Sequence, residues 1–224
     1  MKIISAGPAF IDTEVSLKAT IKDISDDTVC LLGGYELAKN QTISDFKKTF
    51  SKVIVFNQEQ IANRTRQFMS FEYFRMLKDA DEVWDYDEFN IASLKPIRND
   101  VKLVLLQPCD ELNAGTSTKD IDVLFYGAMN DHRQNIIQQL KQHHVNVVTP
   151  SGIWGSQLNT YIARTKICLN IHYYYETALQ EQARMIRWTS SNANIISEPS
   201  RTNYMKVHEV PYNSIVEEVL CQLK

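Results

Sequence analysis

The sequence predicts a doubly wound α/β fold, and three features of the chain support this prediction. Short apolar runs rich in β-branched residues recur along the 224 residues. The runs are continuous rather than alternating, which is typical of parallel strands that are buried on both faces. Amphipathic stretches with apolar residues at three- and four-residue spacing lie between the runs. Strands that alternate with helices in this way favour a parallel sheet covered by helices.

Each apolar run is predicted to be a strand. The predicted strands are KIISA (2–6), TVCLLGG (28–34), KVIVFN (52–57), EVWDY (82–86), VKLVLLQP (101–108), IDVLFYG (121–127), VNVVTP (145–150), KICLNIHYY (166–174) and ANIISEP (193–199). Helices are predicted over 64–81, 131–144, 154–166, 178–192 and about 212–223. Asp85-Tyr86-Asp87 has the letters of a metal-binding triplet, but its place between a strand and a helix favours a helix cap.

A polar segment near the middle of the chain divides it into two predicted domains, 1–112 and 113–224. The segment DELNAGTSTKD (110–120) combines turn formers, small residues and charges without apolar periodicity, so a linker is expected there. Residues 1–112 hold 14 basic and 18 acidic residues, whereas residues 113–224 hold 10 and 9. A bound anion is therefore expected in the second half.

The composition excludes several classes of function. Apolar residues make up 44% of the chain and its net charge is −3, so a core is expected and nucleic-acid binding is not. The four cysteines are far apart, and no apolar stretch reaches the length of a membrane span, so we expect a soluble, cytoplasmic protein with no integral membrane segment. Neither GxGxxG nor GxxxxGK[ST] occurs, and no cluster of His, Asp or Glu has the spacing of a metal site.

The junction after the predicted strand 121–127 is the first candidate site, because ligands of parallel sheets bind outside the carboxyl ends of strands. Gly127 allows a ligand to approach the backbone closely, the loop Ala128-Met129-Asn130 is small or polar, and Arg133 lies in the first turn of the next helix. Free N–H groups and a guanidinium at this place can hold a diphosphate. A tight turn with an arginine facing solvent is the alternative.

The junction after residues 166–174 carries a dense set of polar side chains. Glu176 lies just before the predicted helix and Glu181 about one turn inside it. Carboxylates suit sugar and ribose hydroxyls, since each oxygen accepts two hydrogen bonds. The alternative is a capping glutamate, a surface glutamate and tyrosines packed in the core.

Two further junctions are weaker candidates. Ile153 and Trp154 follow the strand 145–150 in a loop able to flank a nucleobase, although a tryptophan in the core is at least as consistent with the pattern. Asn57 and Glu59 follow the strand 52–57, where an acceptor hydroxyl can bind or where an asparagine can simply cap a helix.

The run from Asp120 to Glu198, together with VFNQEQ and ADEVWDYDEFNI before it, resembles GT-B glycosyltransferases of the retaining family-four group, in a compact viral and bacterial branch. The resemblance implies two Rossmann-like α/β/α domains facing a cleft, with an acceptor-side N-terminal domain and a nucleotide-sugar donor domain after it. It implies transfer of a hexose, with retention, from a nucleoside diphosphate sugar to a glycan or glycoprotein hydroxyl, with GDP-mannose slightly favoured over UDP-glucose. No further cofactor and no metal are expected.

The resemblance also implies a role for each matching residue. Gly127 to Asn130 resemble the loop beneath the diphosphate, and Arg133 and Glu176 resemble the catalytic pair, which binds phosphate and the transferred sugar. Backbone amides of Thr177, Ala178 and Leu179 are expected to bind phosphate, and Glu181 the ribose. The position of the usual second cation is occupied by Gln138, and Lys166 or Arg184 can substitute for it.

The chain departs from the family pattern at two further places. Four residues rather than seven separate the two glutamates, and the first half contains no histidine. These departures keep open a nucleotide-sugar binding module or partner subunit without transfer activity. The length of the chain also allows a regulatory protein like a flavodoxin or response regulator.

Overall fold

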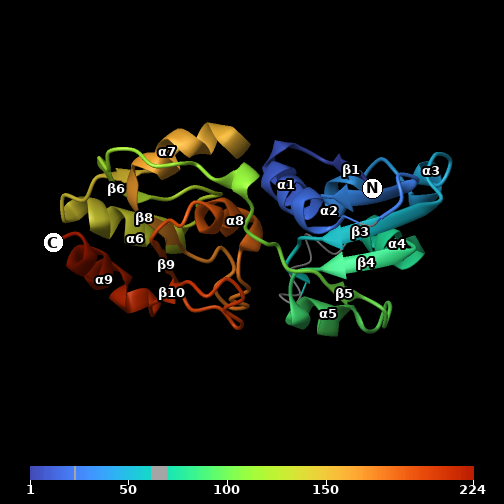
Figure 1. Cartoon of the computed structure of the whole chain (residues 1–224). Coiled ribbons are helices and arrows are strands. Elements are labelled where there is room, and N and C mark those ends of the chain that lie inside the picture. The colour runs from blue at the N-terminus through green and yellow to red at the C-terminus, as the bar shows by residue number, and fades with distance from the viewer. Residues whose placement is uncertain (23, 62–69) are drawn as a thin grey trace. The chain divides into compact units, whose positions relative to one another are not determined.

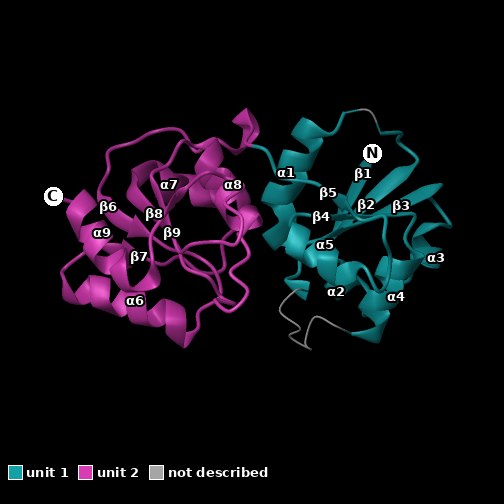
Figure 2. Cartoon of the chain, turned by 90° about the horizontal axis from the view of Figure 1, so that it is seen from below, with its two compact units in different colours: residues 1–107 teal, residues 108–224 magenta. Residues whose placement is uncertain are grey.

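A computed structural model describes residues 1–22, 24–61 and 70–224 of the chain. The chain forms two compact units, residues 1–107 and 108–224, each with a parallel sheet of five described strands (Figure 2). The division falls five residues before the predicted position at 112/113. The mixed α/β class with parallel sheets is confirmed.

Unit 1, residues 1–107, has strands in the sequential order β1-β2-β3-β4-β5. The strands are β1 (Lys2–Ser5), β2 (Thr28–Leu32), β3 (Lys52–Asn57), β4 (Glu82–Asp85) and β5 (Lys102–Leu103). The helices are η1 (Pro8–Phe10), α1 (Ile11–Thr20), α2 (Gly34–Leu37), α3 (Ile43–Phe46), α4 (Phe71–Asp79) and α5 (Glu88–Leu94) (Figure 1).

One apolar cluster joins helices α2 to α5 to a single face of the sheet of unit 1. Alternate strand residues such as Val53 and Val55 of β3 belong to it, together with Tyr73 and Met76 of α4. The intervening residues, such as Ile54, are equally buried and point to the other face. The connections that follow β2, β3 and β4 therefore all lead to helices on one face.

Unit 2, residues 108–224, has the strand order β10-β9-β8-β6-β7. Its strands are β6 (Ile121–Leu124), β7 (Val147–Val148), β8 (Thr165–Asn170), β9 (Ile195–Ser197) and β10 (His208–Glu209). Its helices are η4 (Asp110–Leu112), α6 (Asp131–Gln142), η5 (Gly155–Leu158), α7 (Asn159–Arg164), α8 (Gln182–Ser190), η6 (Tyr212–Ser214) and α9 (Ile215–Gln222).

Helices cover both faces of the sheet of unit 2. Val123 of β6 packs with α6 and α9 in one cluster, whereas the next residue, Leu124, packs with α7 and α8 in another. This alternation is the period of two expected for a strand that is buried on both sides. The doubly wound architecture predicted from the sequence, with helices on both faces of a parallel sheet, is therefore present in unit 2.

Each of the nine predicted strand segments contains a strand, but several boundaries differ. The predicted helix 154–166 ends at Arg164, because Thr165 and Lys166 pair with β6 in β8. The expected helix 64–81 is present from Phe71, and residues 62–69 lie outside the described part. The short strand β10 was not predicted.

The segment expected as a linker, 110–120, belongs to unit 2. Leu112 is fully buried, and the backbone N–H groups of Cys109 and Ala114 donate to Ser190 and Ser191 at the end of α8. The turn formers of this segment made it resemble a linker, whereas one apolar side chain and these hydrogen bonds fix it to the helix.

Candidate functional site

In the sheet of unit 2, the chain adds strands in one direction after β6 and in the opposite direction after β8, and the point between these two strands is the candidate site. From β6 the chain continues to α6 on one face, and from β8 to α8 on the opposite face. Connections that leave neighbouring strands toward opposite faces open a crevice outside the carboxyl ends of the strands, where ligands of such sheets bind. Residues 127–133 and 171–184 follow these two strands.

Arg133 lies in the first turn of α6 and is 1% exposed. Its Nε donates to the carbonyl of Ile171 at 2.8 Å, its Nη1 to the carbonyl of Ala128 at 2.6 Å, and its Nη2 pairs with Glu181 at 3.3 Å. Burial, and then the charge of Arg184, lower its pKa to about 9. The side chain remains a cation at neutral pH, and its hydrogen bonds join the loop after β6 to the loop after β8.

Glu181 occupies the N-cap position of α8, which begins at Gln182. The sequence placed Glu181 one turn inside this helix, and that expectation is wrong, because residues 174–178 form a separate turn and Ala178 has a φ of 49°. Burial alone would raise the pKa of Glu181, but His172, Arg184 and Arg133 together lower it to about 2. Its carboxylate is the shared counter-ion of the site.

His172 is buried just beyond β8, and a hydrogen-bond acceptor faces each of its ring nitrogens. Its Nδ1 lies 2.8 Å from Oε2 of Glu181 and its Nε2 lies 3.2 Å from the carbonyl of Pro199. An ionised carboxylate and a carbonyl only accept hydrogen bonds, so we assign the protonated imidazolium to this ring. Burial by itself lowers the pKa of His172, but Glu181 and then Glu198 raise it above its ordinary value.

Arg184 lies in the first turn of α8 beside Gly127. Its Nη1 donates to Oδ1 of Asn170 at 3.0 Å and to the carbonyl of Ile171 at 3.4 Å. Gly127 has a φ of 130°, and a Cβ at this position would lie 2.9 Å from Nη2 of Arg184. The backbone conformation therefore favours glycine here, and any side chain at residue 127 would displace the guanidinium of Arg184.

Glu198 follows β9 and connects the same loops from a third strand. It is buried, and one of its carboxylate oxygens lies 2.8 Å from Nε2 of His132. The other carboxylate oxygen accepts a hydrogen bond from the backbone N–H of His172 at 2.6 Å. The ring of His132 stacks between those of Tyr175 and Tyr212, with centroids 4.6 and 4.0 Å away. Through these contacts Glu198 fixes the position of the exposed loop that carries Tyr175.

The other predicted residues of the loop after β8 differ in their surroundings. Glu176 is exposed and forms no ion pair or hydrogen bond with the part of the chain described here. Thr177 and Leu179 are buried, and the carbonyls of Thr177 and Ala178 accept hydrogen bonds from Arg201.

Of the remaining predicted donor residues, some lie at the carboxyl ends of the strands and one lies near the amino end of a strand. Asn130 caps α6 by accepting the N–H of Arg133, and Met129 beside it is 44% exposed. Trp154 is 42% exposed in the loop after β7, and Ile153 packs on the cluster of α7 and α8. Lys166 does not reach the site, because it lies near the start of β8, about 13 Å of strand from Asn170, and pairs with Asp122.

In unit 1, Asn57 lies in a buried polar network at the ends of β3 and β4. Its amide donates to Asp85 at 2.6 Å and its carbonyl accepts the hydroxyl of Tyr73 at 2.7 Å. Burial raises the pKa of Asp85 to about 8, and burial followed by the charge of Glu36 raises that of Glu59 to about 7. The predicted acceptor side therefore contains one partly exposed carboxyl group, Glu59, that titrates near neutral pH.

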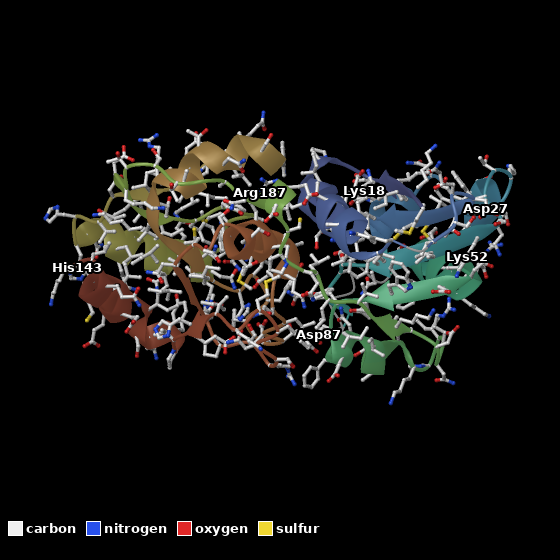
Figure 3. All side chains as sticks on the ribbon, viewed as in Figure 1. Lys18, Asp27, Lys52, Asp87, His143 and Arg187 are labelled. Carbon is white, nitrogen blue, oxygen red and sulfur yellow. The ribbon has the colours of Figure 1, made fainter. Side chains whose placement is uncertain are left out.

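The cap predicted in the triplet 85–87 is confirmed. Asp87, labelled in Figure 3, is the N-cap of α5 and accepts the N–H of Phe89 at 2.8 Å. Among the described residues no group of three or more His, Cys, Asp or Glu side chains is placed to hold a metal ion. All four cysteines are free thiols.

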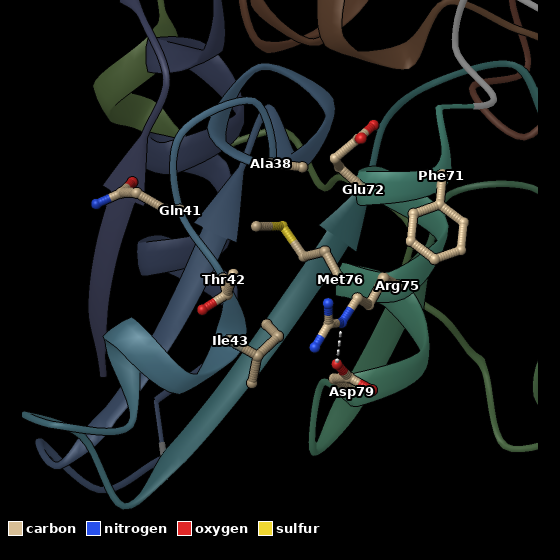
Figure 4. A pocket seen from close by; sticks show the side chains of 9 residues that line it. All are labelled: Ala38, Gln41, Thr42, Ile43, Phe71, Glu72, Arg75, Met76 and Asp79. Atoms are coloured by element: carbon tan, nitrogen blue, oxygen red, sulfur yellow. Dashed lines mark ion pairs between the residues drawn. The ribbon is translucent and has the colours of Figure 1, made fainter.

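A separate hollow lies against α4 of unit 1. Figure 4 shows it between Ala38, Ile43 and Met76, with the ion pair of Arg75 and Asp79, 3.5 Å apart, at its border. Its lining mixes apolar and paired charged groups.

The sequence did not single out three residues that complete the site of unit 2, namely His132, Asn170 and Glu198, as binding residues, and it named Arg184 only as a substitute for the second cation. Asn170 ends β8, and Glu198 follows β9 directly. The signal available was therefore their position at the carboxyl end of an apolar run, the criterion that led to the other residues. Within the described ranges, no helix is long and apolar enough to cross a membrane.

Comparisons with known proteins find relatives in one virus. Three uncharacterized proteins of Acanthamoeba polyphaga mimivirus are 27%, 25% and 25% identical to the chain over 207, 171 and 206 residues. These matches cover 82%, 68% and 83% of this chain, but 22%, 21% and 64% of the relatives. The chain thus spans about a fifth of the length of two of them. No family model matches the chain.

Proposed function

We propose that the chain binds a nucleoside diphosphate sugar at the carboxyl edge of unit 2 and transfers its hexose to an acceptor hydroxyl with retention of configuration. The observation that supports this proposal is the position of the polar cluster. Side chains that follow β6, β8 and β9 meet where the strand order changes direction, and there they supply cations for a diphosphate and carboxylates beside them.

The chemistry proposed for this site is the stabilisation of a departing diphosphate. Preorganised cations lower the barrier most when they lie where negative charge develops. The imidazolium of His172 and the two guanidiniums are held in place by hydrogen bonds before any ligand binds. A phosphate oxygen of the leaving group accepts the proton of the acceptor hydroxyl, so the mechanism demands no separate protein base.

The roles of Asn57 and Glu59 on the acceptor side, and the arrangement of the two units across one cleft, remain predictions. GDP-mannose, then UDP-glucose, are the donors we would test first, with a glycan or glycoprotein as acceptor. Metal is expected to be dispensable. Transfer that is lost in a chelator and restored by manganese would contradict this mechanism.

The first experiment is a thermal-shift screen with UDP-, GDP-, ADP- and dTDP-sugars. A ligand at about 100 times its dissociation constant stabilises a protein by about 2.7 kcal/mol. The donor that raises the midpoint is then incubated with candidate acceptors, and the anomeric configuration of the product is read by NMR. A folded chain that responds to no sugar nucleotide would exclude the proposal.

The second candidate function is a sugar-nucleotide binding module without transfer activity. One observation favours it specifically. Glu176, expected to bind the transferred sugar, is exposed and has no polar partner among the described residues, so nothing in them fixes its position. Donor binding without sugar transfer and without hydrolysis, over a broad set of acceptors, distinguishes this candidate from the enzyme.

A further inference from the structure

The charges of the candidate site do not balance. Arg133, Arg184 and the imidazolium of His172 are cations, and Glu181 and Glu198 are the carboxylates among them. The two guanidiniums stand over the same ring, with their central carbons 5.4 and 5.6 Å from the centroid of Phe125. Because like charges held this close repel, an anion beside them is favoured.

The cation without an ion pair is Arg184 rather than Arg133. Arg133 is 1% exposed, all three of its nitrogens donate to protein atoms, and it forms an ion pair with Glu181. Arg184 is partly exposed, and only its Nη1 donates to an atom of the described residues. Within 1–22, 24–61 and 70–224, no carboxylate forms an ion pair with Arg184, and its Nε and Nη2 have no hydrogen-bond partner.

Gly127 lies close against this guanidinium. An added Cβ would lie 2.9 Å from Nη2, 3.2 Å from Cζ and 3.2 Å from Nε of Arg184, so a side chain at residue 127 would push the guanidinium out of its position. The carbonyls bound by Nη1, on Asn170 and Ile171, hold the opposite side of the group. The free edge is thus fixed in direction before a ligand arrives.

We propose that Arg184 binds a phosphate oxygen pair of the ligand through Nε and Nη2, and that Arg133 is a positioning residue that does not touch the ligand. A guanidinium presents these two N–H groups in parallel, which matches two oxygens of a phosphate. The ligand class is a diphosphate. Its nucleoside part rests on the proposed function, whereas the contact with phosphate does not.

Isothermal titration calorimetry with UDP, GDP and inorganic pyrophosphate tests this assignment. We compare the wild-type chain with Arg184→Gln, Arg184→Lys and Gly127→Ala. The matched control is Arg164→Gln, which removes the same charge at the opposite edge of the sheet, where Arg164 pairs with exposed Asp120. Circular dichroism confirms that each variant is folded, and Arg184→Lys serves as the decisive variant if Arg184→Gln does not fold.

The expected result is a loss of affinity for the diphosphate that binds. A charge-assisted pair of hydrogen bonds corresponds to a factor of about 10 to 100 in the dissociation constant. Arg184→Gln and Gly127→Ala should show this loss, Arg184→Lys a smaller one because the ammonium keeps the charge without the paired geometry, and Arg164→Gln none. Unchanged affinity in Arg184→Gln, or equal losses in the control, would overturn the assignment.

The two proposals fail in distinguishable ways. If pyrophosphate binds and depends on Arg184 while no nucleotide binds, the phosphate contact stands and the proposed function fails. If a nucleoside diphosphate binds equally well without Arg184, the proposed function stands and the assignment of Arg184 is wrong. If no diphosphate binds to the folded wild-type chain, both are wrong.

Discussion

Replacing Arg133 by alanine should unfold the chain more easily even when no ligand is present. The substitution removes the ion pair with Glu181 and the hydrogen bonds to the carbonyls of Ile171 and Ala128. Removing one partner of a buried ion pair costs about 3–5 kcal/mol, and each unsatisfied buried acceptor about 1–3 kcal/mol. These costs are not additive, and Glu181 keeps His172 as a partner, so we expect a loss of about 4 kcal/mol in the free energy of unfolding.

Urea unfolding followed by fluorescence of buried Trp188 measures this loss, and a thermal scan should show a midpoint lower by about 8–16 °C for a chain of this size. The control is Arg164→Ala, whose exposed ion pair with Asp120 should contribute less than about 1 kcal/mol. If Arg133→Ala is as stable as the control variant, the guanidinium does not join the two loops. A contact with ligand would then be its main role.

Three further predictions concern titration and thiol reactivity. Because the pKa of Glu59 is about 7 in the folded chain and near 4.5 otherwise, Glu59 should contribute a fall of about 3 kcal/mol in the free energy of unfolding as the pH rises from about 4.5 to about 7. Glu59→Gln should remove this contribution in urea titrations at a series of pH values and leave that of Asp85, whose pKa burial raises to about 8; an unchanged pH profile would contradict the prediction. Because the pKa of His172 is raised in the folded chain, the protonated ring stabilises the fold at a pH below the ordinary histidine pKa, and this stabilisation is lost as the pH rises through the folded pKa. His172→Asn should therefore be less stable than wild type at about pH 6, and the two should differ least at alkaline pH. A difference in stability that grows with pH would contradict the assignment of an imidazolium. A thiol reagent should label exposed Cys221 first. Cys30 and Cys168 should react only when the chain unfolds, because burial raises the pKa of Cys30 to about 12 and also raises that of Cys168. Rapid labelling of either buried thiol in the native chain would contradict the packing.

The strands were predictable because a strand that is buried on both faces is a continuous apolar run in the sequence. In unit 1, Val53 to Phe56 are apolar and fully buried at every position, and in unit 2 helices on both sides of the sheet bury the neighbours Val123 and Leu124. β10 is not an apolar run, since its two residues, His208 and Glu209, are polar and lie at the edge of the sheet. Strand order was not predictable, because a continuous apolar run has the same composition at any position of a parallel sheet.

The site was predictable as a place but not as a set of roles. The carboxyl ends of the strands are given by the apolar runs, and this criterion found Gly127, Arg133 and Glu181. Spacing along the chain does not tell which charges neutralise one another. Arg133 therefore appeared to be the cation for a ligand, whereas its hydrogen bonds go to protein carbonyls and to Glu181, and Arg184 keeps a free edge.

The polar groups at the carboxyl ends of the strands are arranged differently in the two units, and this difference indicates where a ligand binds. In unit 1 the connections after β2, β3 and β4 leave toward one face, and the polar groups at these ends, Asn57 and Asp85, are buried and hydrogen-bonded to one another. In unit 2 the connections after β6 and β8 diverge, and the cluster between them retains a cation with an open edge. A sheet that diverges and leaves charge uncompensated at the same point has both the space and the electrostatic reason to bind an anion, so anion binding should map to residues 127–133 and 171–184.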